Sequence, residues 1–190
     1  MGREFKYKDY VEKDKIDFKG DLNKNIRYLL RVPLKNTGEK VIVIMKNPSE
    51  ANKEKADLTI DRLLKFCNSE GYSEVIIMNL FCYYSSDPKG ITKLIDTGKL
   101  LEAIGLQTDK ILKNVLKEVN EVIVAWGGNS INRAPVYKSR IEQVTRLIQN
   151  KKLYYIQSVS KNTYYPRHPQ AWAVNREPKI EKYKWTPRFL

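Results

Sequence analysis

Four short apolar runs, rich in β-branched and aromatic residues, constrain the fold of this chain most. They lie at 41–45, 75–78, 122–126 and 153–156. Continuous apolar runs of this length are typical of strands that are buried on both faces of a sheet. Stretches with helical spacing separate them, at about 57–71, 108–119 and 130–149. This alternation predicts an α/β fold, a three-layer α/β/α sandwich with a central, mostly parallel four-stranded sheet.

The segments around these runs suggest three parts. We expect residues 1–24 to be a charged N-terminal arm, irregular or partly helical, because they contain few apolar residues. Residues 25–172 are expected to form one α/β domain, in which Asn25–Leu34 is an edge strand with a proline near its end. Residues 173–190 form a basic tail with several aromatic side chains, which we expect to extend or to dock loosely.

The charge of the chain favours a polyanionic partner. Lys and Arg number 35 against 22 Asp and Glu, which gives a net charge of +13. Nucleic acid is the commonest partner of such proteins, and the 12 tyrosines could stack on bases. We therefore predict binding to single- or double-stranded DNA. The alternative is a soluble, Lys-rich protein with no such partner.

Several classes of protein are disfavoured. Two cysteines, Cys67 and Cys82, make no disulfide framework, and with one histidine they do not suggest a zinc site. The first residues are charged and lack the apolar segment of a signal peptide, and no later run is long enough to span a membrane. We expect a cytoplasmic monomer that needs no metal or cofactor.

Polar residues follow the predicted strands where open α/β sheets place their sites. Asn47 and Asn79 follow the first two strands, and His168, the only histidine, lies beyond the fourth. An amide can read the edge of a nucleobase, and a histidine can donate to a developing anion or contact a phosphate. The alternative is structural: the asparagines would make local turn bonds, and the histidine would be packed or exposed.

At these residues the chain resembles a known family. The motifs VIVIMKNPS (41–49), DLTI (57–60), VIIMNLF (75–81), VIVAWG (122–127) and PRHP (166–169) resemble domain-of-unknown-function family 1643 over roughly residues 25–172. Their layout is similar to that of the uracil-DNA glycosylase superfamily. In that superfamily the first motif positions the attacking water, a strand-end Asn reads the flipped pyrimidine, and a late histidine stabilises the departing base.

The resemblance implies roles for particular residues. Asn47 and His168 would be catalytic, and Asn79 would bind the base. Trp172 would be the residue that wedges into DNA, a role that must be weighed against plain core packing. The set expected to contact the base also includes Ser49 and Phe81, with Tyr83 as an alternative to Phe81; the set expected to contact DNA comprises Lys46, Arg167, Gln170 and Trp172.

The chain also departs from the superfamily pattern. Ser49 stands where uracil-specific members carry Tyr, Gln170 replaces a Ser, and Ser160–Arg167 separates the fourth strand from His168. An Asn at position 47 cannot accept a proton as a general base. We therefore expect a DNA-binding protein with weak, altered or absent glycosylase activity. The alternatives are an active glycosylase on uracil or a modified base, and an interaction protein whose basic groove docks an acidic DNA-mimic inhibitor.

Overall fold

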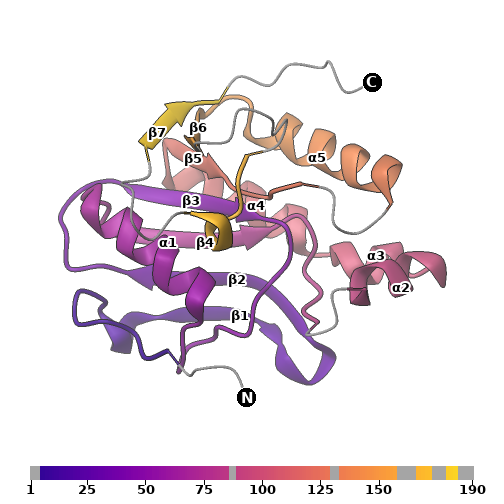
Figure 1. The fold of residues 1–190 in the computed structure, drawn as a ribbon, viewed down its shortest axis with the longest axis horizontal. Coiled ribbons are helices and arrows are strands. Elements are labelled where there is room, and N and C mark those ends of the chain that lie inside the picture. Colours follow the sequence, from indigo (N-terminus) through magenta and orange to yellow (C-terminus); the bar gives the residue numbers. More distant parts are fainter. Residues whose placement is uncertain (1–4, 86–88, 129–132, 158–165, 173–178, 184–190) are drawn as a thin grey trace.

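A seven-stranded mixed sheet forms the centre of the structure (Figure 1). The computed structural model describes residues 5–85, 89–128, 133–157, 166–172 and 179–183. The strands lie in the order β1-β2-β4-β3-β5-β6-β7. The four inner strands β3 (Lys40–Met45), β4 (Glu74–Asn79), β5 (Glu121–Val124) and β6 (Lys152–Gln157) are parallel to one another. They confirm the four strands predicted from the apolar runs.

The prediction of a four-stranded sheet was wrong, because three antiparallel strands extend it. β2 (Ile26–Pro33) pairs with β4, so it is not an edge strand, and β1 (Asp17–Asp21) pairs with β2. At the other edge, β7 (Lys179–Lys182) pairs with β6. β1 and β7 are short and charged, which is how natural edge strands avoid further pairing. The same composition removes the apolar pattern by which a strand is recognised in a sequence.

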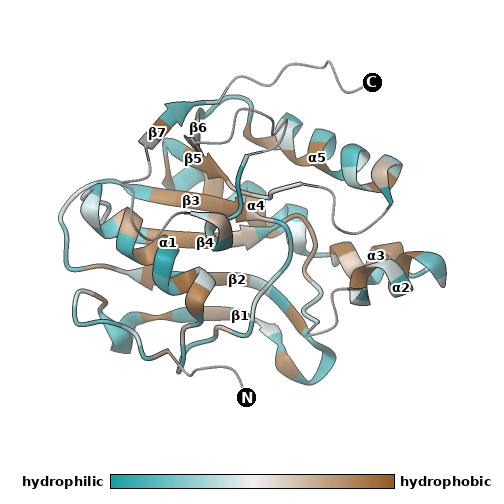
Figure 2. Cartoon of the chain, in the orientation of Figure 1, coloured by the Kyte–Doolittle hydropathy of each residue, from teal (hydrophilic) through white to brown (hydrophobic). Residues whose placement is uncertain are grey.

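Helices cover both faces of the sheet. α1 (Leu58–Ser69) packs on one face, together with Tyr7, Val11 and Ile16 from the N-terminal residues. The other face is covered by α4 (Thr108–Val115), α5 (Ala134–Ile148) and the 3-10 helix η3 (Leu116–Glu118), as the hydropathy colouring in Figure 2 illustrates. Side chains alternate along each strand, so that Val43 faces α1 and Ile44 faces α5.

The helix ends follow from their sequences. The Asp57 carboxylate accepts a hydrogen bond from the Ile60 N–H and caps α1, which ends before Gly71 at a positive φ of 82°. Pro135 lies in the first turn of α5, where its missing N–H costs nothing. The short helices α2 (Gly90–Asp96) and α3 (Leu100–Ile104) were not predicted. The remaining elements are the 3-10 helices η1 (Lys13–Lys15), η2 (Leu22–Lys24) and η4 (Pro169–Ala171).

The strand order places a topological switch point at the centre of the sheet. From β3 the chain crosses to β4 on one side, and from β4 it returns to β5 on the other side of β3. Open α/β sheets bind their ligands outside the carboxyl ends of the strands at such a point. The loops that follow β3 and β5 are therefore the place to examine for function.

Candidate functional site

Asn47 lies two residues beyond β3, at the switch point. The backbone N–H groups of Leu80 and Phe81 donate to the carbonyls of Met45 and Lys46, at 2.9 Å each, so the ends of β3 and β4 are tied together. The Asn47 side chain is partly buried, and its Nδ2 donates to the Pro48 carbonyl at 3.2 Å. This local bond is the one that the structural alternative predicts.

Asn79 ends β4 and pairs with Met45 in the neighbouring strand. By the alternation of side chains it faces α1, on the same side as Val75 and Ile77. Its side chain is 3% exposed, and neither Oδ1 nor Nδ2 has a hydrogen-bond partner among the described residues. A buried polar atom left without a partner costs about 1–3 kcal/mol. The side chain therefore makes no turn bond, and its amide is free to accept and donate in the strand-end layer.

His168 lies directly over the turn that follows β5. The Gly127 N–H donates to the Pro166 carbonyl at 2.7 Å, and a Cβ added at Gly127 would lie 3.2 Å from the His168 Cβ. Gly127 also has a positive φ of 69°, a conformation that favours glycine, and a side chain there would press on His168. Residues 166–168 are therefore held across the end of β5. His168 shares the strand-end layer with Asn47.

The imidazole of His168 is neutral at physiological pH. Burial, reinforced by the nearby charge of Lys46, lowers its pKa from 6.5 to about 4, against an opposing effect of Asp57. Its Nδ1 accepts a hydrogen bond from the Gln170 N–H at 3.3 Å. A neutral imidazole has one protonated nitrogen, so its proton is on Nε2. His168 thus presents a neutral donor.

Lys46 connects the ends of β3 and β5. Its Nζ lies 5.6 Å from the centroid of the Tyr137 ring, and the Tyr137 hydroxyl donates to the carbonyls of Trp126 at 3.0 Å and Gly127 at 2.7 Å. Burial lowers the pKa of Lys46 to about 8, so the amine is mostly charged at pH 7. The site therefore combines a cation, a neutral donor and an unpartnered amide.

The strand order places these groups in one row across the end of the sheet. β4 and β5 flank β3, and neighbouring strands lie about 4.8 Å apart, so their ends are separated by roughly 10 Å. Asn79 stands at one side of this span and His168 at the other, with Asn47 between them.

The other residues predicted to contact the base or DNA lie in the core or at the surface beside the strand ends. Phe81 is fully buried in the core on the α5 side, whereas Tyr83 is partly exposed. Trp172 is 6% exposed and packs edge-on against Phe66 of α1 at 5.3 Å, so its present position is that of the core-packing alternative. Its Nε1 donates to the partly buried Arg167 carbonyl at 3.2 Å, whereas Gln170 is exposed and its carbonyl accepts from Arg62. Residues 160–165 lie outside the described part of the chain.

Arg27 belongs to the same layer and was missed by the sequence reasoning. It is 2% exposed, and its Nη1 donates to the Ala51 carbonyl at 2.8 Å and the Ser49 carbonyl at 3.4 Å. A β-bulge brings it there: Lys19 pairs with Leu29 and Gly20 with Arg27, so Tyr28 is the additional residue. An arginine inside an apolar strand pattern is the signal that could have identified it.

The described ranges contain neither a candidate metal site nor a candidate membrane-spanning helix. No group of three or more His, Cys, Asp or Glu side chains there could hold a metal ion. Among the same residues, no helix is both long and apolar enough to cross a membrane.

Comparison with known proteins places the chain in a family. No curated protein and no solved structure matches it. A family model described as "Protein of unknown function (DUF1643)" matches residues 27–170, which include β2 to β6, Asn47, Asn79 and His168. The chain therefore belongs to the DUF1643 family.

Proposed function

We propose that this protein binds nucleic acid through a uracil-DNA glycosylase-like fold and holds a single base at the strand-end layer. Asn79 would pair with the edge of the base, and Lys46, Arg167 and Gln170 would contact the backbone. An extruded base costs a few kcal/mol of lost stacking, which a fitted pocket can offset. The net charge of +13 supports the attraction to a polyanion.

The observation that carries this proposal is the buried Asn79 amide. Folded proteins satisfy nearly all of their buried polar groups, and the exceptions call for an explanation. Asn79 is an exception at both of its polar atoms, within the residues described. A nucleobase edge offers a donor next to an acceptor, which is the complement of an amide. A bound base would therefore supply both missing partners.

The state of Asn47 supports weak or altered catalysis. Its Nδ2 is engaged with the Pro48 carbonyl, and an amide oxygen cannot take a proton from water. Hydrolysis would then depend on polarisation of the base alone. Binding is consequently the primary activity that we propose.

Binding can be tested with fluorescently labelled oligonucleotides at several salt concentrations. We expect the affinity to fall steeply as salt rises, because phosphate contacts release counterions. Asn79→Leu should weaken binding about tenfold through loss of the base contact, whereas Asn114→Leu, on the exposed side of α4, should not. Absence of DNA binding at low salt would contradict the proposal.

One observation favours the alternative of an active glycosylase. A neutral His168 with its proton on Nε2 can donate to the anion of a departing base without a change in its own charge. The test is release of free base from single- and double-stranded DNA that carries uracil or modified bases. Release that is lost in His168→Gln would establish the activity, and no release across the panel would exclude it.

Docking of an acidic DNA-mimic protein remains a prediction from charge. Such a partner would use the same cations as DNA. Competition between the two for the wild-type protein, and joint weakening by Lys46→Gln, is the expected result. Binding of the mimic that DNA does not displace would contradict it.

A further inference from the structure

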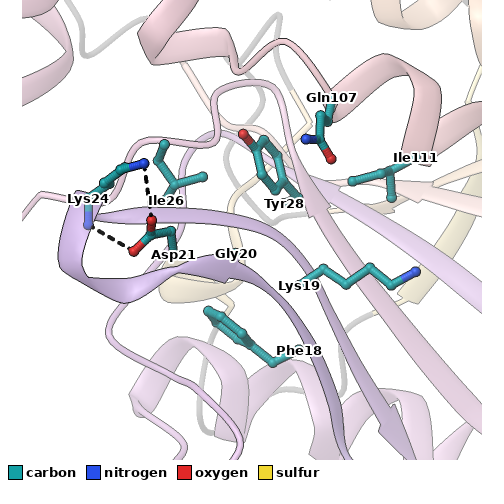
Figure 3. Close-up of a pocket in the computed structure, with 9 residues that line it drawn as sticks. All are labelled: Phe18, Lys19, Gly20, Asp21, Lys24, Ile26, Tyr28, Gln107 and Ile111. Carbon is teal, nitrogen blue, oxygen red and sulfur yellow. Dashed lines mark hydrogen bonds and ion pairs between the residues drawn. The ribbon is translucent and has the colours of Figure 1, made fainter.

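Two cavities lie beside the β1–β2 hairpin, and they differ in the state of their polar groups. The larger, of about 530 Å³, is lined by Lys19, Tyr28 and Gln107 among others (Figure 3). Its Lys24 is paired with Asp21 at 3.5 Å, and no described residue lining it has a buried polar atom without a partner. The smaller, of about 330 Å³, is lined by Phe18, Ile26, Arg27, Ser49, Lys55 and Tyr84 among others. This second cavity is the one with an unexplained charge.

The unexplained charge is that of Arg27. Its Nη1 bonds to two backbone carbonyls, but its Nε and Nη2 have no partner among the residues described. The Arg27 guanidinium forms no ion pair with the described residues. Asp57 lies close enough to raise the pKa of Arg27, but its carboxylate accepts hydrogen bonds from the N–H groups of Ala51 and Ile60 instead. Burial lowers the pKa of Arg27 to about 10, so it remains charged at pH 7.

Arg140 shows what this chain does with a structural buried arginine. It is 1% exposed, and every nitrogen of its guanidinium has a partner. Nε donates to the Leu80 carbonyl at 2.8 Å, and Nη1 and Nη2 donate to the two Asp109 oxygens at 3.1 and 2.6 Å. Arg27 differs in that its Nε and Nη2 lack partners among the described residues and in that no carboxylate there forms an ion pair with it, although Asp57 lies close enough to raise its pKa. Removal of a charge from water is costly unless a counter-charge compensates it.

The free donors define the chemistry of the missing anion. Nε and Nη2 are adjacent on one edge of the guanidinium, which matches two oxygens of a carboxylate or phosphate. Ser49 adds a buried hydroxyl without a partner in the described structure, and Lys55 adds a second cation to the lining. The acidic Glu50 of the lining accepts a hydrogen bond from the Tyr84 hydroxyl at 2.8 Å. Four donors and two cations exceed what a carboxylate can use, and they suit the three terminal oxygens of a phosphate.

We propose that the cavity between β2 and the loop after β3 binds a phosphate group, with Arg27, Ser49 and Lys55 as its ligands. The β-bulge opposite Gly20 changes the direction of the Arg27 side chain, so that Arg27 lines this cavity. A Cβ at Gly20 would lie 2.2 Å from the Ile26 carbonyl oxygen, so the bulge requires glycine. The inference that the cavity binds a phosphate does not depend on the function proposed above. The inference that this phosphate belongs to the end of a nucleic acid does rest on that function.

Calorimetric titration with inorganic phosphate tests the cavity, with sodium chloride at matched ionic strength as the reference. We expect saturable binding in the wild type. Arg27→Met should raise the Kd at least about tenfold, and Ser49→Ala and Lys55→Gln by about three- to tenfold each. The matched control is Lys53→Gln, which removes an exposed lysine two residues from Lys55 and should leave the Kd unchanged. The two milder variants keep the test valid if Arg27→Met does not fold.

Either of two results would overturn the proposal: no saturable binding in the wild type, or the same Kd in all variants. A second titration compares one oligonucleotide with a 5′-phosphate and with a 5′-hydroxyl group. A preference for the phosphate that Arg27→Met abolishes supports a nucleic-acid end as the source. Equal binding of the two, together with phosphate binding in the cavity, supports a small phosphate ester. Loss of DNA binding with retention of phosphate binding would count against the proposed function alone.

Discussion

The two faces of the sheet hold their buried arginines differently at the strand ends. On the α5 face, Arg140 and Tyr137 are buried and each polar atom of their side chains is bonded, although Trp126 Nε1 and Thr145 Oγ1 lack partners in the described residues. On the α1 face, Asn79, Arg27 and Ser49 carry buried polar atoms without partners in the described residues. The same chain can therefore satisfy buried polar groups where only packing is required. The difference between the two arginines is the one that an anion bound beside Arg27, as proposed above, would explain.

The strongest test replaces each buried arginine with methionine in turn and compares the two losses in the free energy of unfolding. Arg140→Met should lower the free energy of unfolding by about 3 kcal/mol, because the Leu80 carbonyl loses its donor and Asp109 its cation. Arg27→Met should cost less than about 1 kcal/mol, because it also removes an uncompensated charge. Urea denaturation followed by tryptophan fluorescence measures both. Equal costs would mean that Arg27 is as well satisfied as Arg140.

The second prediction concerns the pH dependence of stability. The pKa of His168 is about 4 in the folded protein against 6.5 unfolded, so the unfolded state binds more protons between these values. The contribution of neutral His168 to the free energy of unfolding is fully present above about pH 6.5. It is lost as the pH falls towards 4, by about 3 kcal/mol in all. Denaturation of wild type and His168→Gln across this window isolates the effect, because the carboxylates titrate in both. Parallel curves for the two proteins would contradict a buried, neutral His168.

The third prediction compares one polar group from each face. Tyr137→Phe should lower the free energy of unfolding by about 1–2 kcal/mol, because it removes the donor to the Trp126 and Gly127 carbonyls. Asn79→Leu should be neutral or stabilising, because both polar atoms that it removes lack partners. Thermal unfolding gives both values. A clear loss of stability in Asn79→Leu would show that its amide is satisfied within the protein.

The smallest expected effect belongs to Lys46. Because the pKa of Lys46 is about 8, its charge is lost as the pH rises from 7 to 9, and the phosphate contact proposed for it would be lost as well. The slope of log affinity for DNA against log salt should decrease by about one across this range. Lys46→Gln should show the smaller slope at every pH, whereas the exposed Lys53→Gln should behave as the wild type. An unchanged slope would place Lys46 outside the DNA contacts.

Local patterns predicted much of the architecture. The apolar runs identified the four parallel strands, and the helical spacing over 57–71 identified α1, because these signals depend on neighbours in sequence. The residues at 47, 79 and 168 were singled out by their place after strands. β1, β7 and the short helices α2 and α3 escaped prediction. Their sequences lack a clear apolar period, and their stability comes from pairing or packing with distant parts of the chain.

By itself, the sequence determined the four parallel strands, helix α1, the cationic charge and the set of strand-end side chains. The tertiary structure alone decided which of these side chains are buried and which have partners. Phe81 and Trp172 lie in the core, His168 lies over Gly127 and is held neutral, and Arg27 enters the layer through a bulge. Apolar period and charge are local properties of a sequence. Desolvation and hydrogen bonding depend on groups that only folding brings together, and these decide what the site can bind.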